Sequence, residues 1–219
     1  MNDFKVDIKR HARRRNVSLY IINADTIEVR APAWVSESYI NELLAKKNKW
    51  ILQQLAKQMP VQDFMPGSHV LLKGDNFNLE WISAGQSYLK GEHLFVKANN
   101  SQQAGRAVSR FLKVQAEQFL EDRFDYWVRC TGFSPNGLSV RTFKARWGSC
   151  DIFGNIKLNW RLIQAPPAVV DYVIIHELCH LQEMNHSVHF WRSVEQFDPN
   201  FKKHRRWLKD NGNRLMAVG

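Results

Sequence analysis

A five-residue segment, His176 to His180, constrains the fold of this chain more than any other. It reads His-Glu-Leu-Cys-His, and the turns before it are apolar at residues 168–170 and 173–175. Residues four apart lie on one face of an α-helix, so helical structure here would point both imidazoles to the same side. The apolar residues predict that the other helix faces are buried. Two prolines, at 166 and 167, suit the first turn, because proline lacks the N–H that would stay unpaired there.

Two imidazoles on one helical face can hold a divalent metal ion. Zinc binds imidazole nitrogen at about 2.0–2.1 Å, and a catalytic zinc site keeps one position open for water. Glu177 lies beside the same face, where a carboxylate can accept a proton from that water. The spacing therefore predicts one zinc ion per chain, bound by His176 and His180. It also predicts that Glu177 is the general base of a hydrolytic reaction.

A catalytic zinc needs a third protein ligand, and His186 is the leading candidate. It follows His180 by six residues, the interval found in the longer metzincin motif. The glycine that turns the chain in that motif is replaced here by Glu183. We expect the helix to continue to Glu183 and Asn185, which tolerates the left-handed conformation, to make the turn.

Three other residues compete for this role. Glu183 shares the helix face of both histidines, but three ligands on one straight helix would span about 10 Å and could hardly surround one ion. His189 could bind metal or act as a donor to the substrate, and Glu195 could supply a carboxylate from a later helix. We expect His186 to be the ligand.

The formal net charge of +10 is concentrated in two clusters. Such clusters can mark contact with a polyanion, or they can form a solvated basic face. No helix-turn-helix, zinc-finger or RNA-binding signature accompanies the charge, so nucleic acid is possible as a partner but not favoured. The first cluster surrounds His11 and consists of Lys9, Arg10, Arg13, Arg14 and Arg15. The second surrounds His204 and consists of Lys202, Lys203, Arg205 and Arg206.

The N-terminal residues lack the apolar segment of a signal peptide, and no apolar stretch approaches the roughly 20 residues that span a bilayer. We therefore expect a cytoplasmic protein with no membrane partner. Cys130, Cys150 and Cys179 are widely spaced and odd in number, so we expect reduced thiols rather than a disulfide framework.

The order of predicted elements indicates an α+β fold. A hairpin is expected at 17–22 and 26–30, a helix from Ser36 to about Lys57, strands within 69–97, and a long helix from 105 to about 128. Strands at 138–142, 144–150 and 156–160 precede three helices, the last ending at Gly212 as its C-cap. We expect a β-rich N-terminal lobe, residues 1–100, followed by a metal-binding lobe, residues 101–219.

Several segments between residues 146 and 191 form a recognisable pattern: Arg146-Trp147-Gly148-Ser149-Cys150, Leu158-Asn159, Pro167, Asp171-Tyr172-Val173-Ile174, the motif 176–181, Asn185-His186-Ser187 and Phe190-Trp191. This part of the sequence resembles the YgjP-like family of predicted zinc-dependent hydrolases, which is grouped with the WLM and SprT-like metallopeptidases.

The resemblance implies a zincin-like fold whose active-site helix lies under a sheet edge. It also implies that His176, His180 and His186 bind zinc and that Glu177 is catalytic. An edge strand beside the metal can pair with an extended peptide. The candidate substrate-binding residues are Arg146, Trp147, Gly148, Ser149 and His189.

The leading functional hypothesis is a zinc metallopeptidase acting on a peptide or protein. A second is a metal-dependent nucleoside triphosphate pyrophosphatase, an activity linked to the same family and compatible with the basic charge. A third is a nucleic-acid-associated binding protein with a structural zinc. A structural site is usually closed by four protein ligands, and only three strong candidates are present.

Overall fold

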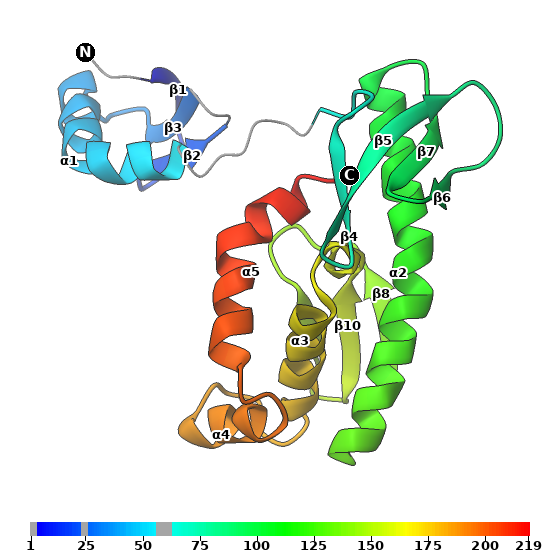
Figure 1. Cartoon of the computed structure of the whole chain (residues 1–219). Helices are drawn as coiled ribbons and strands as arrows, with labels where there is room; N and C mark the ends of the chain where they lie inside the picture. The colour runs from blue at the N-terminus through cyan, green and yellow to red at the C-terminus, as the bar shows by residue number, and fades with distance from the viewer. Residues whose placement is uncertain (1–3, 23–25, 56–62) are drawn as a thin grey trace. The chain divides into compact units, whose positions relative to one another are not determined.

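The computed structural model describes residues 4–22, 26–55 and 63–219 (Figure 1). The chain is a mixed α+β protein, as predicted, with strands and helices distributed over two compact units, Met1–Val61 and Gln62–Gly219. The division lies well before residue 100, where the sequence analysis places the lobe boundary. The strands between residues 69 and 97 share one hydrophobic core with the helices that follow them, and they therefore belong to the second unit.

Unit 1 is a three-stranded sheet with one helix. Strand β3 (Thr26–Pro32) is central, pairing in parallel with β1 (Lys5–His11) and antiparallel with β2 (Ser18–Ile21). The predicted hairpin of β2 and β3 is confirmed, while its turn at 23–25 lies outside the described residues. Helix α1 (Glu37–Leu55) is also confirmed, although its expected end near Lys57 lies outside them too.

Strand β1 was not predicted, and of its residues only Lys9, Arg10 and His11 were noted, as part of a basic cluster. Apolar and charged residues alternate along β1, which is typical of a strand with one solvated face. Lys9 from β1 and Arg30 from β3 form ion pairs with Glu28, whose side chain is buried. The hydrogen bond from Lys9, and then that from Arg30, hold the pKa of the Glu28 carboxyl below its usual range.

Unit 2 contains two small sheets. The first has the order β4-β5-β7-β6 and comprises β4 (His69–Leu72), β5 (Asp75–Ile82), β6 (Tyr88–Lys90) and β7 (His93–Lys97). The second has the order β8-β10-β9. Its central strand β10 (Asn155–Asn159) pairs in parallel with β8 (Gly137–Arg141) and antiparallel with β9 (Gly148–Cys150). Strand β9 is therefore an edge strand.

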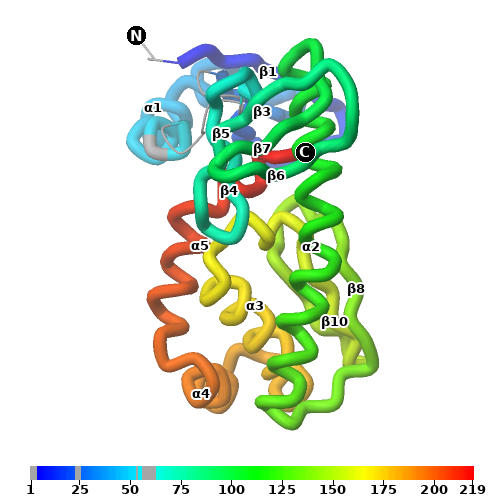
Figure 2. The backbone as a smooth tube through the Cα atoms, turned by 45° about the vertical axis from the view of Figure 1, so that its right-hand side comes forward, coloured from blue at the N-terminus to red at the C-terminus, as the bar shows by residue number. Residues whose placement is uncertain are grey.

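The helices of unit 2 are α2 (Ser101–Thr131), α3 (Pro167–Cys179), α4 (Val188–Phe197) and α5 (Phe201–Met216), with a 3₁₀ helix, η1 (Trp160–Gln164), before α3. Figures 1 and 2 both place α3 between α5 on one side and α2 with β10 on the other. Helix α2 begins earlier than predicted, because the Asn100 side chain accepts a hydrogen bond from the Gln103 N–H at 2.9 Å and caps it.

The core of unit 2 runs without interruption from the first sheet to α5. Its fully buried side chains include Leu79 and Val96 from the first sheet, Leu112 from α2, Leu158 from β10 and Ile174 from α3. Helix α3, apolar on nearly every face, lies within this core as predicted. Among the described residues, no helix is both long and apolar enough to span a bilayer.

An ion pair at the rim of this core ties α2 to α3. The Arg123 guanidinium donates two hydrogen bonds to the Asp171 carboxylate, one of them at 2.7 Å from Nε to Oδ1. The arrangement is bidentate, and the side chain of Asp171 is only 15% exposed. The start of α3 is therefore anchored to the long helix by charge as well as by packing.

Two predicted helix ends are wrong. Helix α3 ends at Cys179 instead of continuing to Glu183. Helix α5 continues through Gly212, which was expected to be its C-cap, and ends at Met216. A Cβ atom at Gly212 would lie 3.3 Å from Cζ2 of Trp147, so the glycine admits the indole ring against α5. The glycine serves close packing, which its position in the sequence does not reveal.

Candidate metal centre

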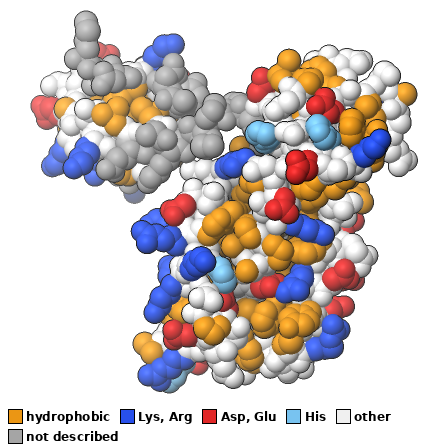
Figure 3. Space-filling model, in the orientation of Figure 1, with side chains coloured by type: hydrophobic (Ala, Val, Ile, Leu, Met, Phe, Trp, Pro, Cys, Tyr) orange, Lys and Arg blue, Asp and Glu red, His pale blue; other side chains and the backbone are white. Residues whose placement is uncertain are grey.

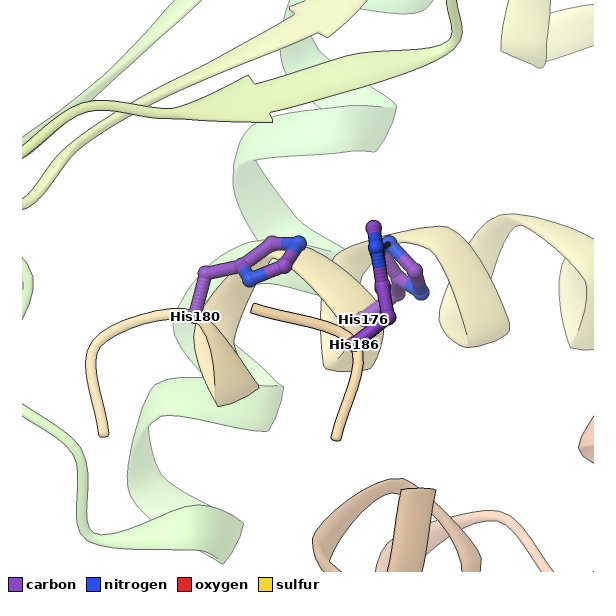
Figure 4. Close-up of side chains that lie close together, drawn as sticks. All are labelled: His176, His180 and His186. Carbon is purple, nitrogen blue, oxygen red and sulfur yellow. Dashed lines mark hydrogen bonds between the residues drawn. The ribbon is translucent and has the colours of Figure 1, made fainter. Parts of the chain in front are cut away.

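Three histidines meet at the C-terminal end of α3. His176 lies in the last turns of the helix, His180 caps it, and His186 returns from the loop that follows. One ring nitrogen from each lies within 4.8 Å of the others, and Nε2 of His176 is 3.1 Å from Nε2 of His186. Figure 4 shows the three rings gathered with nitrogens turned toward one another. The structure thus brings together the three residues predicted as ligands.

The spacing of these nitrogens suits a tetrahedral ion. Two imidazole nitrogens at zinc distance and tetrahedral angle are separated by about 3.3 Å, close to the 3.1 Å between His176 and His186. Burial, followed by the neighbouring histidines, lowers the pKa of His176 to about 3, and burial lowers the pKa of His180. Both rings are therefore neutral at neutral pH, the form that donates a lone pair to a metal.

A backbone contact sets the tautomer of His180. Its Nδ1 lies 3.0 Å from the carbonyl oxygen of Glu183, which can only accept, so Nδ1 carries the proton and Nε2 keeps its lone pair. Glu183, considered as a rival ligand, thus contributes its backbone, and its carboxylate does not join the cluster. The buried Nδ1 of His176 has no hydrogen-bond partner in the part of the chain described.

The loop that carries His186 is fixed by side-chain hydrogen bonds. Asn185 does not adopt the predicted left-handed conformation, since Lys73 is the one non-glycine residue with positive φ among those described. Instead, Oδ1 of Asn185 accepts a hydrogen bond from the Ser187 N–H at 3.0 Å. Ser187 then caps α4 through the Phe190 N–H at 3.2 Å.

Two aromatic rings on α4 support the cluster from one side. The Phe190 ring stacks on His180 with centroids 4.5 Å apart, and the Trp191 ring stacks on His186 at 5.7 Å. Phe190 is fully buried, whereas His186 is exposed. The exposed ligand candidate is thus held in place by its neighbours, and one side of the cluster stays accessible.

Glu177 is buried beside the cluster, with 6% of its surface exposed. Burial raises the pKa of its carboxyl to about 8, against the opposing effects of the Arg146 charge and of a hydrogen bond from the Cys150 N–H. A carboxylate that holds a proton more tightly than usual is suited to accept one near neutral pH.

The edge strand β9 lies directly against Glu177. A Cβ atom on Gly148 would lie 2.6 Å from Oε1 and 2.7 Å from Cγ of Glu177, closer than real side chains approach. Only glycine at this position lets the strand come so near without displacing the carboxylate. Trp147, the residue before β9, packs over Gly212 on α5. The start of β9 therefore contacts α3 through Gly148 and follows a residue that contacts α5.

A pocket of about 300 Å³ opens beside His176 and Glu177. Of the predicted substrate-binding residues, Trp147 and Gly148 line it. Ser149 lies next to them in β9, paired with β10, while Arg146 is exposed nearby and His189 is exposed on α4 and does not line the pocket. The remaining lining residues come from α3 and α5: Tyr172, Val173, Arg205, Leu208 and Lys209.

The three α5 residues were missed as site residues. Arg205 was noticed only as part of a basic cluster, and Leu208 and Lys209 were not singled out. Arg205 and Lys209 are four apart and so share a helix face, but which face of a helix meets the site is decided by its packing. The other predicted rivals, His189 and Glu195, are exposed and lie outside the histidine cluster.

The chain is similar to a metallopeptidase family and to two solved metallopeptidase zymogens. The family model described as YgjP-like, metallopeptidase domain, matches residues 15–211. The solved metallopeptidase zymogen of Pyrococcus abyssi abylysin is 26% identical, with a TM-score of 0.38 over 41% of this chain and 92% of that chain. The solved metallopeptidase zymogen of Methanocaldococcus jannaschii jannalysin is 14% identical, with a TM-score of 0.38 over 42% of this chain and 95% of that chain. No curated protein matches the chain. Because the family model spans most of its length, the chain belongs to the YgjP-like metallopeptidase family.

Proposed function

We propose that this protein is a zinc metallopeptidase in which His176, His180 and His186 bind one zinc ion and Glu177 is the general base. The observation that carries the proposal is the convergence of three imidazoles beside a buried carboxylate at an open pocket. The family membership supports a divalent metal and a peptide or protein substrate. The spacing of the histidines and the neutral state of His176 and His180 support zinc in particular.

The chemistry follows from what each group supplies. Zinc, when bound, acts as a Lewis acid toward the carbonyl oxygen and acidifies water. Glu177 accepts one proton from the attacking water at its carboxylate, while the water oxygen bonds to the carbonyl carbon. The C–N bond then breaks, and Glu177 delivers that proton to the leaving amine. The products are a carboxylic acid, which ionises, and an amine.

Strand β9 offers a place for the substrate backbone. The Asn159 N–H donates to the Trp147 carbonyl at 2.8 Å, so the backbone of Trp147 faces β10. Because backbone groups alternate sides along a strand, the N–H and C=O of Gly148 face the open edge, and Glu177 lies against the face of the strand at the same residue. We propose that an extended peptide pairs with Gly148 along this edge and presents its scissile bond to Glu177.

The proposal is tested by zinc content and peptide hydrolysis in matched variants. The parent protein should contain one zinc per chain and cleave peptides. His186→Ala should lose zinc and activity, whereas Glu177→Gln should keep zinc and lose activity. His189→Ala is the matched control, because His189 is exposed and outside the cluster, and it should keep both. Chelation should abolish activity, and added zinc should restore it.

Either of two outcomes would contradict the proposal. A parent protein without metal after reconstitution with zinc would show that the histidines do not form a metal site. Full peptidase activity in the zinc-loaded Glu177→Gln variant would show that Glu177 is not the base.

The pyrophosphatase hypothesis remains a second candidate because Arg205 and Lys209 line the pocket and could face phosphate groups. Metal-dependent release of pyrophosphate from a nucleoside triphosphate, without peptide cleavage, would support the pyrophosphatase hypothesis over the peptidase proposal. The structural-zinc hypothesis has less support, because no fourth His, Cys, Asp or Glu in the described ranges joins the cluster.

A further inference from the structure

Two cations face the pocket from α5. Arg205 and Lys209 are four residues apart, one helical turn, and both line the pocket together with His176 and Glu177. Figure 3 shows Lys and Arg side chains along the flank of unit 2 that α5 occupies in Figure 1. Both side chains are exposed, like most of this basic flank, but they also line the pocket. Their charge therefore acts on whatever binds there.

Neither cation is neutralised by the protein. Within the described ranges, no carboxylate forms an ion pair with Arg205 or Lys209. The nearby carboxylate of Asp198 is already bound to Nδ1 of His204 at 2.8 Å. Glu177 is the single acidic residue lining the pocket, and it is turned toward β9 by the Cys150 N–H. The part of the pocket beside α5 thus has unpaired positive charge.

Arg205 is also held in a defined position. Its guanidinium lies 4.9 Å from the centroid of the Trp191 ring, and that ring in turn stacks on His186. Stacking on an aromatic face restricts the long side chain while leaving its N–H donors free at the edge. A preorganised donor loses less entropy on binding an anion than a free surface arginine does. Arg205 thus differs from the solvated arginines elsewhere on α5.

We infer that this pocket selects peptides with an acidic side chain next to the scissile bond, and that Arg205 and Lys209 bind its carboxylate. The inference rests on the proposed peptidase function and names its substrate class. A volume of about 300 Å³ lies at the lower limit of small-molecule pockets, so it suits one side chain better than a whole nucleotide. Leu208 and Trp147 line the same pocket and provide apolar contact for the methylene groups.

The test uses the zinc-loaded full chain and peptides that differ only in one residue, Glu or Gln. A mixed peptide library read by mass spectrometry first locates the cleaved bonds, and matched pairs then give kcat/KM. Because each exposed ion pair contributes about 0.2–1 kcal/mol, two together should favour the Glu peptide roughly two- to thirtyfold. Arg205→Ala should lower kcat/KM for the Glu peptide more than for the Gln peptide, and so remove most of this preference. Lys209→Ala should reduce it.

Arg206→Ala is the matched control, since Arg206 is the next residue on the same helix and does not line the pocket. This variant should keep the preference of the parent. Raising the salt concentration should weaken the preference in the parent and have little effect in Arg205→Ala, because exposed charges are screened.

Three results would overturn the inference. Equal cleavage of Glu and Gln peptides by an active parent would refute the selectivity and leave the peptidase proposal standing. An equal loss for both peptides in Arg205→Ala would assign Arg205 to the reaction itself instead. If no peptide is cleaved, the peptidase proposal fails, and binding of labelled Glu and Gln peptides is compared by fluorescence anisotropy. Equal affinities there, or tighter binding and hydrolysis of a nucleoside triphosphate, would refute the inference as well.

Discussion

The close contact between β9 and Glu177 makes Gly148→Ala an informative substitution. An added Cβ would lie 2.7 Å from Cγ of Glu177, whereas two carbon atoms in contact sit about 3.5 Å apart, so one of them must move by roughly 0.8 Å. The strand is held by β10, whereas Glu177 lines the pocket and has space there to move into. The side chain of Glu177 is therefore the group expected to shift.

A displacement of about 1 Å in a catalytic group can cost roughly 100-fold in rate. We expect Gly148→Ala to lower kcat/KM for peptide hydrolysis by about that factor. Overpacking should cost only about 1–3 kcal/mol of stability, so the protein should stay folded. The zinc content should not change, because the three atoms nearest the new methyl group all belong to Glu177 and none to a histidine.

Gly137→Ala is the matched control. Gly137 belongs to β8 in the same sheet, and an added Cβ would meet nothing within 4 Å. This variant should keep the activity, zinc content and melting temperature of the parent. If Gly148→Ala were folded and fully active, the argument that glycine is required for the approach of β9 would be wrong. If it lost zinc, the effect would belong to the metal centre and not to Glu177.

Three further predictions concern stability. Arg123→Ala breaks the bidentate pair with Asp171 and should lower the free energy of unfolding by about 1–2 kcal/mol, seen as a lower urea midpoint with an unchanged slope. Gly212→Val puts a branched side chain against the Trp147 ring and should cost about 1–3 kcal/mol in the same experiment, whereas a gain in stability would show that the contact is loose. The pKa of Glu28 is lower in the folded unit than in the unfolded chain, so its ion pairs stabilise unit 1 above the ordinary glutamate pKa of about 4.3 and lose this effect as the pH falls further. The protection factors of unit 1 amides, which are corrected for the intrinsic pH dependence of hydrogen exchange, should therefore fall at acidic pH, and less so in a Glu28→Gln variant.

Local patterns predicted most of the elements and the three clustered histidines. The hairpin of β2 and β3, the capped start of α1 at Ser36 and the apolar α3 are encoded by short-range periodicity and turn chemistry. The spacing of His176 and His180 depends only on helix geometry. Such features can be inferred because each one is decided by residues close together in the sequence.

Features decided by distant contacts were not predicted. Strand β1 pairs in parallel with β3, and no local signal marks a parallel pairing. Gly212 looks like a helix end in the sequence, but it is a packing site for an indole ring 65 positions earlier. The cations of the pocket belong to a basic helix whose other cations face solvent. Only the docking of α5 on α3 distinguishes Arg205 from its neighbours.

The three free cysteines differ in accessibility, so their rates of reaction with a thiol reagent can report local opening of the structure. Cys130 is exposed, Cys150 is partly buried in β9, and Cys179 is fully buried within the helix that carries the histidines, 3.4 Å from the Ser193 hydroxyl. A thiol reagent should modify Cys130 at once, and should reach Cys179 only when α3 separates from α4. The slowest labelling rate therefore reports how often the metal-binding helix opens, without any introduced label. Comparing that rate with and without zinc would give the stabilisation that the ion contributes to this part of the protein.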